Sequence, residues 1–334
     1  MNNLSTPPKV ILPKIDIHVN IIGNGKQGSG CRTSIPLWQT PLVRIMGQSI
    51  GLNISMGDPL ADLLYQQKLA HWIRTSSLDQ AVILACDNLY DEAGRCHTGK
   101  TAIYVPNDYV LKLAEMCPQF LAGVSIHPAR PDAIEELERC ASQGAKLVKL
   151  LPCVQSVDCN RSQYRSFWRR MAELNLSLLA HTGGEISMPV NRPDLESVDT
   201  LLLPLKSGVN VIAAHCGTRA IPGGRDHLDQ FLKMRDVFGN LYGDIAALSQ
   251  VTHLRTLEKL RENPRRILYG SDYPVVTSIV WARLKGWISK EETSRLQRIK
   301  NPMQKGFEFT KALGFPETIF TDFNRIVNAP QIKR

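Results

Sequence analysis

Short apolar runs alternate with amphipathic stretches along most of the chain. The runs are rich in Val, Ile and Leu and have the length of buried parallel strands. They comprise residues 14–18, 80–85, 121–126, 146–151, 176–181, 209–215, 241–246 and 266–272. Between them, apolar residues recur every three or four positions, as in helices with one buried face. Such stretches include residues 132–143, 163–173 and 227–238.

Strands that alternate with helices in this way predict an α/β fold, namely a (β/α)8 TIM barrel. We expect one domain over residues 1–334, with a loop insertion at about 21–58 and a C-terminal helical extension from about 285. Helical stretches at 291–300 and 304–313 would form the last barrel helix and this extension. Because the insertion follows the first strand, it would cover the carboxyl face of the barrel as a lid or substrate loop.

Composition is that of an ordinary globular protein, with 43% hydrophobic and 21% charged residues among 334. The N-terminus lacks the apolar segment of a secretory signal, and no run approaches the ~20 residues that cross a bilayer. Eight cysteines occur without a CxxC pair, as expected for reduced thiols. These features predict a cytoplasmic protein with no membrane partner.

The net charge of +9 is spread along the chain, with an excess of basic residues near the C-terminus. No aromatic-basic interleaving or nucleic-acid motif accompanies it, so a solvated basic face is favoured over a polyanion-binding surface. We therefore expect a small-molecule substrate, for which a carboxylate is compatible, and no nucleic-acid partner. The sequence leaves the oligomeric state open, a homo-oligomer included.

Residues 23–28 match the GxGxxG pattern of dinucleotide-binding proteins. The pattern requires a following helix whose N-terminus holds the pyrophosphate, but here Ser29, Cys31 and then prolines follow. There is also no Asp or Glu between Ile17 and Gly57 to bind a ribose. A Rossmann fold is therefore disfavoured.

Polar residues stand at the carboxyl ends of seven of the eight predicted strands, the exception being the second, at Cys86. They are His18, His127, Lys149, His181, His215, Asp244 and Asp272. The carboxyl ends of all strands of a (β/α)8 barrel meet on one face, so these side chains should gather at one mouth. Imidazole and carboxylate together suit a borderline metal such as zinc, and a catalytic site needs three protein ligands plus water.

The chain resembles the amidohydrolase superfamily, and within it the branch of aminocarboxymuconate semialdehyde decarboxylase-like metal-dependent hydrolases. The matching segments are IDIH at 15–18, LAHTGGE at 179–185, AAHCG at 213–217, LYGD at 241–244 and GSDYP at 270–274. The resemblance implies one divalent metal ion, usually zinc, held by His18, His181 and Asp272. It also implies catalytic roles for His215, which would act on the water or substrate, and for Asp272.

One position departs from the family pattern, because Asn20 stands where the second histidine of an HxH pair would be. An amide oxygen is a weak zinc ligand, so Asn20 would at best make a poor contact with the metal or a hydrogen bond to the bound water. Lys149 occupies the place of a carboxylated lysine in bimetallic relatives, but a substrate carboxylate or an ion pair is favoured. His127 could contact substrate or belong to a turn. Asp244 could orient His215 or Lys149, or cap a helix.

Three functions remain open at this stage. The first is a metal-dependent hydrolase in which metal-activated water attacks a small-molecule substrate, with His215 or Asp272 moving the proton. The second is a nonoxidative decarboxylase of the same branch, which would use the same residues. The third is a noncatalytic ligand-binding barrel, suggested by the loss of a ligand at Asn20.

Overall fold

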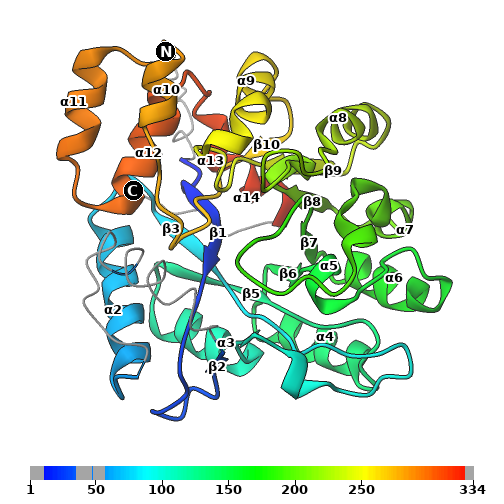
Figure 1. Ribbon diagram of the computed structural model, residues 1–334. Coiled ribbons are helices and arrows are strands. Elements are labelled where there is room, and N and C mark those ends of the chain that lie inside the picture. The colour runs from blue at the N-terminus through cyan, green and yellow to red at the C-terminus, as the bar shows by residue number, and fades with distance from the viewer. Residues whose placement is uncertain (1–10, 35–46, 48–56, 328–334) are drawn as a thin grey trace, which may run out of the picture.

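Eight parallel strands form the sheet of a (β/α)8 barrel, as predicted, in the computed structural model, which describes residues 11–34, 47 and 57–327. The strands follow one another around the barrel in chain order, and helices surround them (Figure 1). They are β1 (Ile15–Asn20), β3 (Gln80–Leu84), β5 (Phe120–Val124), β6 (Leu147–Leu150), β7 (Ser177–His181), β8 (Val211–Ala214), β9 (Leu241–Asp244) and β10 (Ile267–Leu268).

All eight strands lie within the predicted runs to within a few residues, and the largest difference is in the last one. Only Ile267 and Leu268 form regular strand structure there. The chain beyond them still pairs with β1, because Ile17 N–H donates to Tyr269 O and Asp272 N–H donates to His18 O. Asp272 has a φ of 60°, so regular strand geometry cannot continue through it. These contacts close the barrel between its last and first strands.

Helices follow the strands at the positions where the amphipathic pattern predicts them. Those around the barrel are α2 (Ala61–Arg74), α3 (Asn107–Met116), α4 (Ala133–Ser142), α5 (Pro152–Gln155), α6 (Arg165–Glu173), α7 (Leu202–Lys206), α8 (Leu228–Val237), α9 (Leu254–Glu262) and α10 (Val280–Leu284). Within the described part of the chain, no helix has both the length and the apolarity required to span a bilayer.

Four further helices follow, namely α11 (Lys290–Arg298), α12 (Pro302–Ala312), α13 (Thr318–Thr321) and α14 (Phe323–Val327). The first two begin at side-chain caps. Ser289 Oγ accepts the N–H of Glu292, and Asn301 Oδ1 accepts the N–H groups of Met303 and Gln304. Such caps satisfy backbone donors that have no partner within the helix. α12 then packs against α2 (Figure 1).

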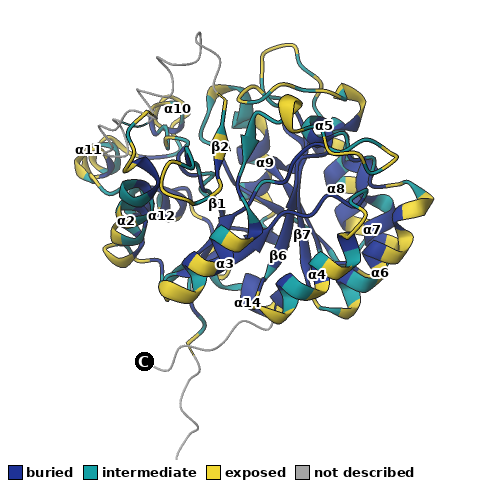
Figure 2. Ribbon diagram, turned by 90° about the horizontal axis from the view of Figure 1, so that it is seen from below, coloured by how far each residue is buried: buried dark blue, intermediate teal, exposed yellow. Residues whose placement is uncertain are grey.

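The apolar core has two parts, one between the strands and the helices and one inside the barrel. The inner part is built from alternate residues of the strands, such as Ile15 and Ile17 on β1 and Leu179 on β7. Phe323, Ile326 and Val327 of α14 join it. α14 therefore closes the end of the barrel opposite the carboxyl ends of the strands (Figure 2).

The described start of the predicted loop insertion is tied to the first barrel helix. Asp62 of α2 accepts the backbone N–H groups of Asn24 and Gly25 and the hydroxyl of Ser29. The GxGxxG segment is thus a loop that leads directly into β2 (Arg32–Thr33), a strand that pairs with β4 (Ile103–Tyr104), where the dinucleotide pattern requires a helix. Residues 35–46 and 48–56, on which the lid prediction mainly rests, lie outside the described residues.

Closure of the barrel by α14 leads to a stability prediction. Phe323 is fully buried within the inner core, so Phe323→Ala should lower the free energy of unfolding by about 3 to 5 kcal/mol. The matched control is Arg325→Ala on the same helix, whose exposed side chain should contribute within about 0.5 kcal/mol. Urea denaturation of both variants measures the difference. Equal losses would contradict the role assigned to α14.

Candidate active site

An irregularity in β1 decides which of its side chains reach the barrel interior. Ile15 and Ile17 point inward, so strict alternation would turn His18 outward. The register against β3 shifts between Asp16 and Val19, which inserts one extra residue into β1. As a result, His18 and Asn20 face the interior at the carboxyl end, and Val19 joins the outer core. Gly270 lets the segment after β10 approach β1 closely, because a Cβ there would lie 2.8 Å from His18 Cβ.

His18 lies at the centre of the polar cluster. Its Nδ1 is 2.9 Å from Asp244 Oδ2, and its Nε2 is 3.0 Å from Lys149 Nζ and 3.3 Å from Asp272 Oδ1. Asp244 fixes the proton on Nδ1, so Nε2 accepts a hydrogen bond from the Lys149 ammonium. Burial and the neighbouring charge of Lys149 lower the pKa of His18, which keeps the ring neutral.

Asp244 joins two of the histidine-bearing strands. Besides His18, its carboxylate accepts the backbone N–H of His215 at 2.8 Å and that of Ala246 at 3.2 Å. Burial alone would raise the pKa of Asp244, but the hydrogen bond from His18 and the charges around it lower it to about 2. Asp244 therefore contacts both histidines, which is the arrangement that an orienting residue requires.

His215 and His181 stand side by side at the mouth, with ring centroids 4.9 Å apart. His215 Nδ1 is 2.9 Å from Ala246 O, which places the proton on Nδ1 and leaves the lone pair on Nε2. His181 Nε2 is 3.3 Å from Gly184 O and 3.8 Å from Glu185 Oε2. Burial, followed by the proximity of His215 and Lys149, holds the pKa of His181 well below its usual value.

Asn20 and Asp272 form a pair at the rim of the cluster. Asn20 Nδ2 donates to Asp272 Oδ1 at 2.8 Å, and the Asn20 carbonyl oxygen accepts the hydroxyl of Tyr65. Position 20 therefore faces the predicted site, as the HxH comparison implies. Its amide is used to hold the Asp272 carboxylate.

Lys149 projects from β6 into the same cluster and is 3% exposed. Its nearest polar partner is His18 Nε2. Burial lowers the pKa of Lys149, whereas the nearby carboxylates Asp272, Asp244 and Glu185 raise it in part. Sequence reasoning placed Lys149 at the mouth but gave no signal for its contact with His18, which lies on a distant strand.

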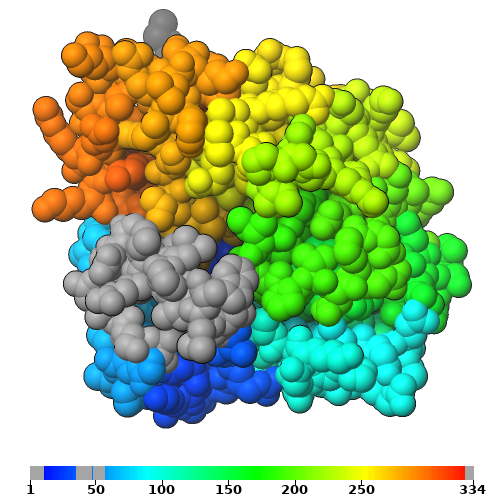
Figure 3. Space-filling model, in the orientation of Figure 1, coloured from blue at the N-terminus to red at the C-terminus, as the bar shows by residue number. Residues whose placement is uncertain are grey.

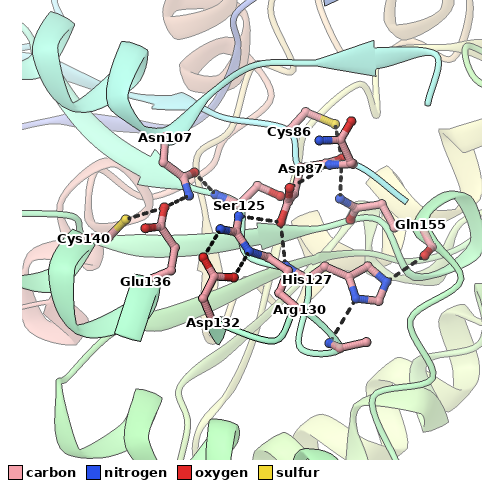
Figure 4. Close-up of polar contacts among 12 residues, drawn as sticks. Cys86, Asp87, Asn107, Ser125, His127, Arg130, Asp132, Glu136, Cys140 and Gln155 are labelled. Carbon is pink, nitrogen blue, oxygen red and sulfur yellow. Dashed lines mark hydrogen bonds and ion pairs between the residues drawn. The ribbon is translucent and has the colours of Figure 1, made fainter. Parts of the chain in front are cut away.

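His127 belongs to a neighbouring network rather than to this cluster (Figure 4). Its Nε2 is 3.0 Å from Gln155 O, and its Nδ1 accepts the N–H of Ala129, so both ring nitrogens bind backbone groups. This geometry is that of a turn residue. The network also contains Asp87, which accepts the N–H of His127 and pairs with Arg130 at 3.3 Å. Asp87 was missed, although it lies only two residues beyond the second predicted strand.

A pocket of about 390 Å³ lies beside that network, between the loops after β3 and β5 and the start of α3. Its charged walls are already paired, because Arg130 contacts Asp87 and Asp132, and Arg139 contacts Glu136. No unpaired positive charge is left in its described lining to select an anionic ligand, so we assign no ligand to it.

Asp16 is a second buried acid that the sequence did not single out. Its Oδ1 accepts the N–H groups of His18 and Ser271, whereas Oδ2 is buried without a hydrogen-bond partner among the described residues. Burial raises the pKa of Asp16 to about 7. Asp16 thus holds the backbone of β1 next to that of the segment after β10. The raised pKa means that burial favours the uncharged form of its carboxyl group.

The three ligands predicted for a divalent ion do not fit one in this arrangement. Lys149 donates to His18 Nε2, the atom through which His18 would bind an ion. Asn20 donates to Asp272 Oδ1, and His181 Nε2 points to the carbonyl of Gly184. Among the residues described, no three His, Cys, Asp or Glu side chains are arranged to hold a metal.

A face view of the molecule shows how the chain surrounds the mouth (Figure 3). Segments from the N-terminal part, in blue, through green and yellow to orange meet around its centre. The loops that follow successive strands therefore share one face, as a (β/α)8 barrel requires.

A comparison with known protein families supports the assignment of this barrel. A model described as Amidohydrolase matches residues 96–298, which is more than half of the chain. The chain therefore belongs to the amidohydrolase family, and the resemblance found in its strand-end motifs is confirmed. A search of curated proteins gives no significant match.

Several solved structures share the fold at low sequence identity. An uncharacterized TIM-barrel protein from Bordetella bronchiseptica is 14% identical, with a TM-score of 0.56 over 90% of this chain and 99% of that one. A probable 2-pyrone-4,6-dicarboxylic acid hydrolase from Acinetobacter baumannii, with citric acid bound, is 13% identical (TM-score 0.53, 91% and 100% covered). A 5-carboxyvanillate decarboxylase from Sphingomonas paucimobilis is 12% identical (0.50, 96% and 100%). At such identities the similarity establishes the fold alone.

The raised pKa of Asp16 predicts a pH dependence of stability. The unfolded chain loses this proton near the ordinary value of 3.8 and the folded one only near 7, so the group costs stability as pH rises through that window. The cost reaches about 4 kcal/mol above pH 7. Asp16→Asn should therefore become more stable relative to the parent between pH 4 and pH 8.

Urea denaturation at a series of pH values measures this effect. Asp108→Asn, at an exposed position of α3, is the control and should track the parent at every pH. A stability difference between Asp16→Asn and the parent that stays constant with pH would contradict the assignment.

Proposed function

We propose that this member of the amidohydrolase family is an enzyme that hydrolyses a small, carboxylate-bearing molecule at the mouth of its barrel. The main support is the convergence of three histidines, one lysine and one aspartate from five different strands. They are His18, Lys149, His181, His215 and Asp272. A fold that brings such groups together in a buried cluster meets the requirements for proton transfer and charge stabilisation.

His215 is the general base of the proposed reaction. Its Nδ1 proton is held by Ala246 O, so Nε2 is free to take a proton from water. Asp244 positions the backbone of the same residue. The deprotonated water attacks a carbonyl carbon, and His215 returns the proton to the leaving group. Asp272, held by Asn20, is the second group that can carry the proton.

Lys149 accounts for the preference for an anionic substrate. Its ammonium is the one lysine charge that the described residues place inside the cluster, and a carboxylate or developing oxyanion would be attracted to it. The citric acid bound to the Acinetobacter baumannii structure shows that a protein of this fold binds a carboxylate. The overall positive charge of the chain would favour the approach of such a substrate.

Decarboxylation is the second candidate and would use the same residues. A carboxylate next to a buried lysine and a proton-bearing histidine can lose carbon dioxide if a group supplies a proton to the resulting carbanion. The similarity of fold to 5-carboxyvanillate decarboxylase is compatible with this chemistry. The zinc-dependent form of either reaction, with His18, His181 and Asp272 as ligands, stays a prediction, as does the noncatalytic barrel.

A substrate panel and one variant test the proposal. We expect release of acid from lactones or esters of small di- and tricarboxylic acids, followed with a pH indicator. His215→Gln should lower kcat/KM by about 10²- to 10⁴-fold, because the base is lost. His71→Gln on the exposed face of α2 should leave activity unchanged.

The same panel includes aromatic carboxylates, with carbon dioxide measured by mass spectrometry. Carbon dioxide release in place of hydrolysis would replace the first candidate with the second. Binding of panel members without turnover would instead favour the noncatalytic barrel.

A further inference from the structure

The donor atoms that a divalent ion would need are bound by groups of the chain itself. His18 has its proton on Nδ1, where Asp244 accepts it, so its only lone pair is on Nε2, 3.0 Å from the Lys149 ammonium. Asn20 holds the Asp272 carboxylate oxygen that lies 3.3 Å from the same His18 atom. The positive charge at this point of the barrel therefore comes from a lysine.

Lys149 holds its amino group at a fixed position in the cluster. It stands on a strand, 3% exposed, so its position is fixed by the barrel wall rather than by a loop. The carboxylates that its charge interacts with are Asp272, Asp244 and Glu185. A divalent ion bound to His18 Nε2 would have to displace the ammonium or lie next to it, and either course is opposed by desolvation or by like-charge repulsion.

We propose that the Lys149 ammonium replaces the divalent metal ion of this family as the electrophile of the active site, so that the enzyme works without a bound metal. The inference rests on the proposed function for its chemistry and on the contacts of His18 for its geometry. Asn20 belongs to the same arrangement, because a lysine-based site no longer needs the second histidine ligand and can use an amide to fix Asp272.

The proposed step balances without a metal or a further co-reactant. Lys149 donates a hydrogen bond to the carbonyl oxygen of the substrate, while His215 Nε2 removes a proton from water. The water oxygen forms a bond to the carbonyl carbon, and the carbonyl electron pair moves to the oxygen, where the ammonium stabilises the negative charge. When the oxyanion collapses, the bond to the leaving group breaks and His215 returns the proton to it.

Metal analysis and zinc titration test the inference without a known substrate. The parent protein, purified without chelator, should contain less than about 0.1 equivalents of transition metal per chain by elemental analysis and bind Zn²⁺ weakly by calorimetry. Lys149→Met removes the ammonium at similar volume, and Lys149→Met combined with Asn20→His also restores the ligand pair. The double variant should gain about one equivalent of zinc and bind it at least tenfold more tightly than the parent.

Lys146→Met is the matched control, because Lys146 directly precedes β6 and lies outside the cluster. It should bind zinc as the parent does. Circular dichroism establishes that each variant is folded, and Lys149→Gln replaces Lys149→Met in both variants if the latter does not fold. One metal per chain in the parent, lost on His181→Ala, would overturn the inference, as would a double variant that gains no zinc affinity.

Activity separates this inference from the proposed function. Parent protein that turns over a member of the carboxylate panel equally well with and without EDTA supports both. Turnover that EDTA abolishes and zinc restores would keep the hydrolase and overturn the role of Lys149. A metal-free parent that binds no zinc but acts on nothing in the panel would count against the proposed function, while the metal measurements still support the assignment of the cation.

Discussion

The buried carboxylate of Asp244 is the interaction on which the rest of the site depends. One oxygen fixes the proton of His18 on Nδ1, and the other holds the backbone of His215. The first contact leaves the lone pair of His18 on Nε2, which faces Lys149. The second contact fixes the backbone position from which the His215 side chain extends. A fully buried carboxylate is tolerated only because several donors satisfy it, which explains why its pKa falls to about 2 despite burial. The carboxylate that organises the site, that of Asp244, is thus itself fully buried.

A few departures from regular strand geometry bring the other site residues close to Asp244. The extra residue in β1 turns His18 inward, and the positive φ of His215 and Asp272 turns their strand ends towards the mouth. Bulges and left-handed residues cost free energy and persist where the surrounding structure fixes them. Here the fixing groups include Asp16, which accepts backbone N–H groups from β1 and from the segment after β10. The residues with unusual backbone geometry are therefore the site residues themselves or their direct neighbours in the chain.

Much of this could be predicted from the sequence, because buried strands and amphipathic helices leave clear periodic patterns. The strand-end rule of the barrel likewise brought His18, His181, His215 and Asp272 to one face. The phase of β1 could not be predicted, since Ile15 and Ile17 alone imply that His18 points outward. Nor could the partners of Lys149 and Asn20, because pairings between strands far apart in the chain depend on side-chain geometry. His127 is a candidate by its position at a strand end, but both of its ring nitrogens bind backbone groups, which the sequence does not indicate.

Closure of the barrel by segments far apart in the sequence has a consequence for its biosynthesis. β1 pairs with the segment after β10, and α14 fills the opposite opening, so the first strand finds its last partners only when residues beyond 320 have left the ribosome. Until then, the side chains of Ile15 and Ile17 lack their contacts with α14, and one edge of β1 lacks its backbone hydrogen bonds. Contacts between residues so far apart in sequence slow folding, and exposed strand edges favour association with other chains. The first strand therefore stays incompletely covered until the segment after β10 and α14 are available to pack against it.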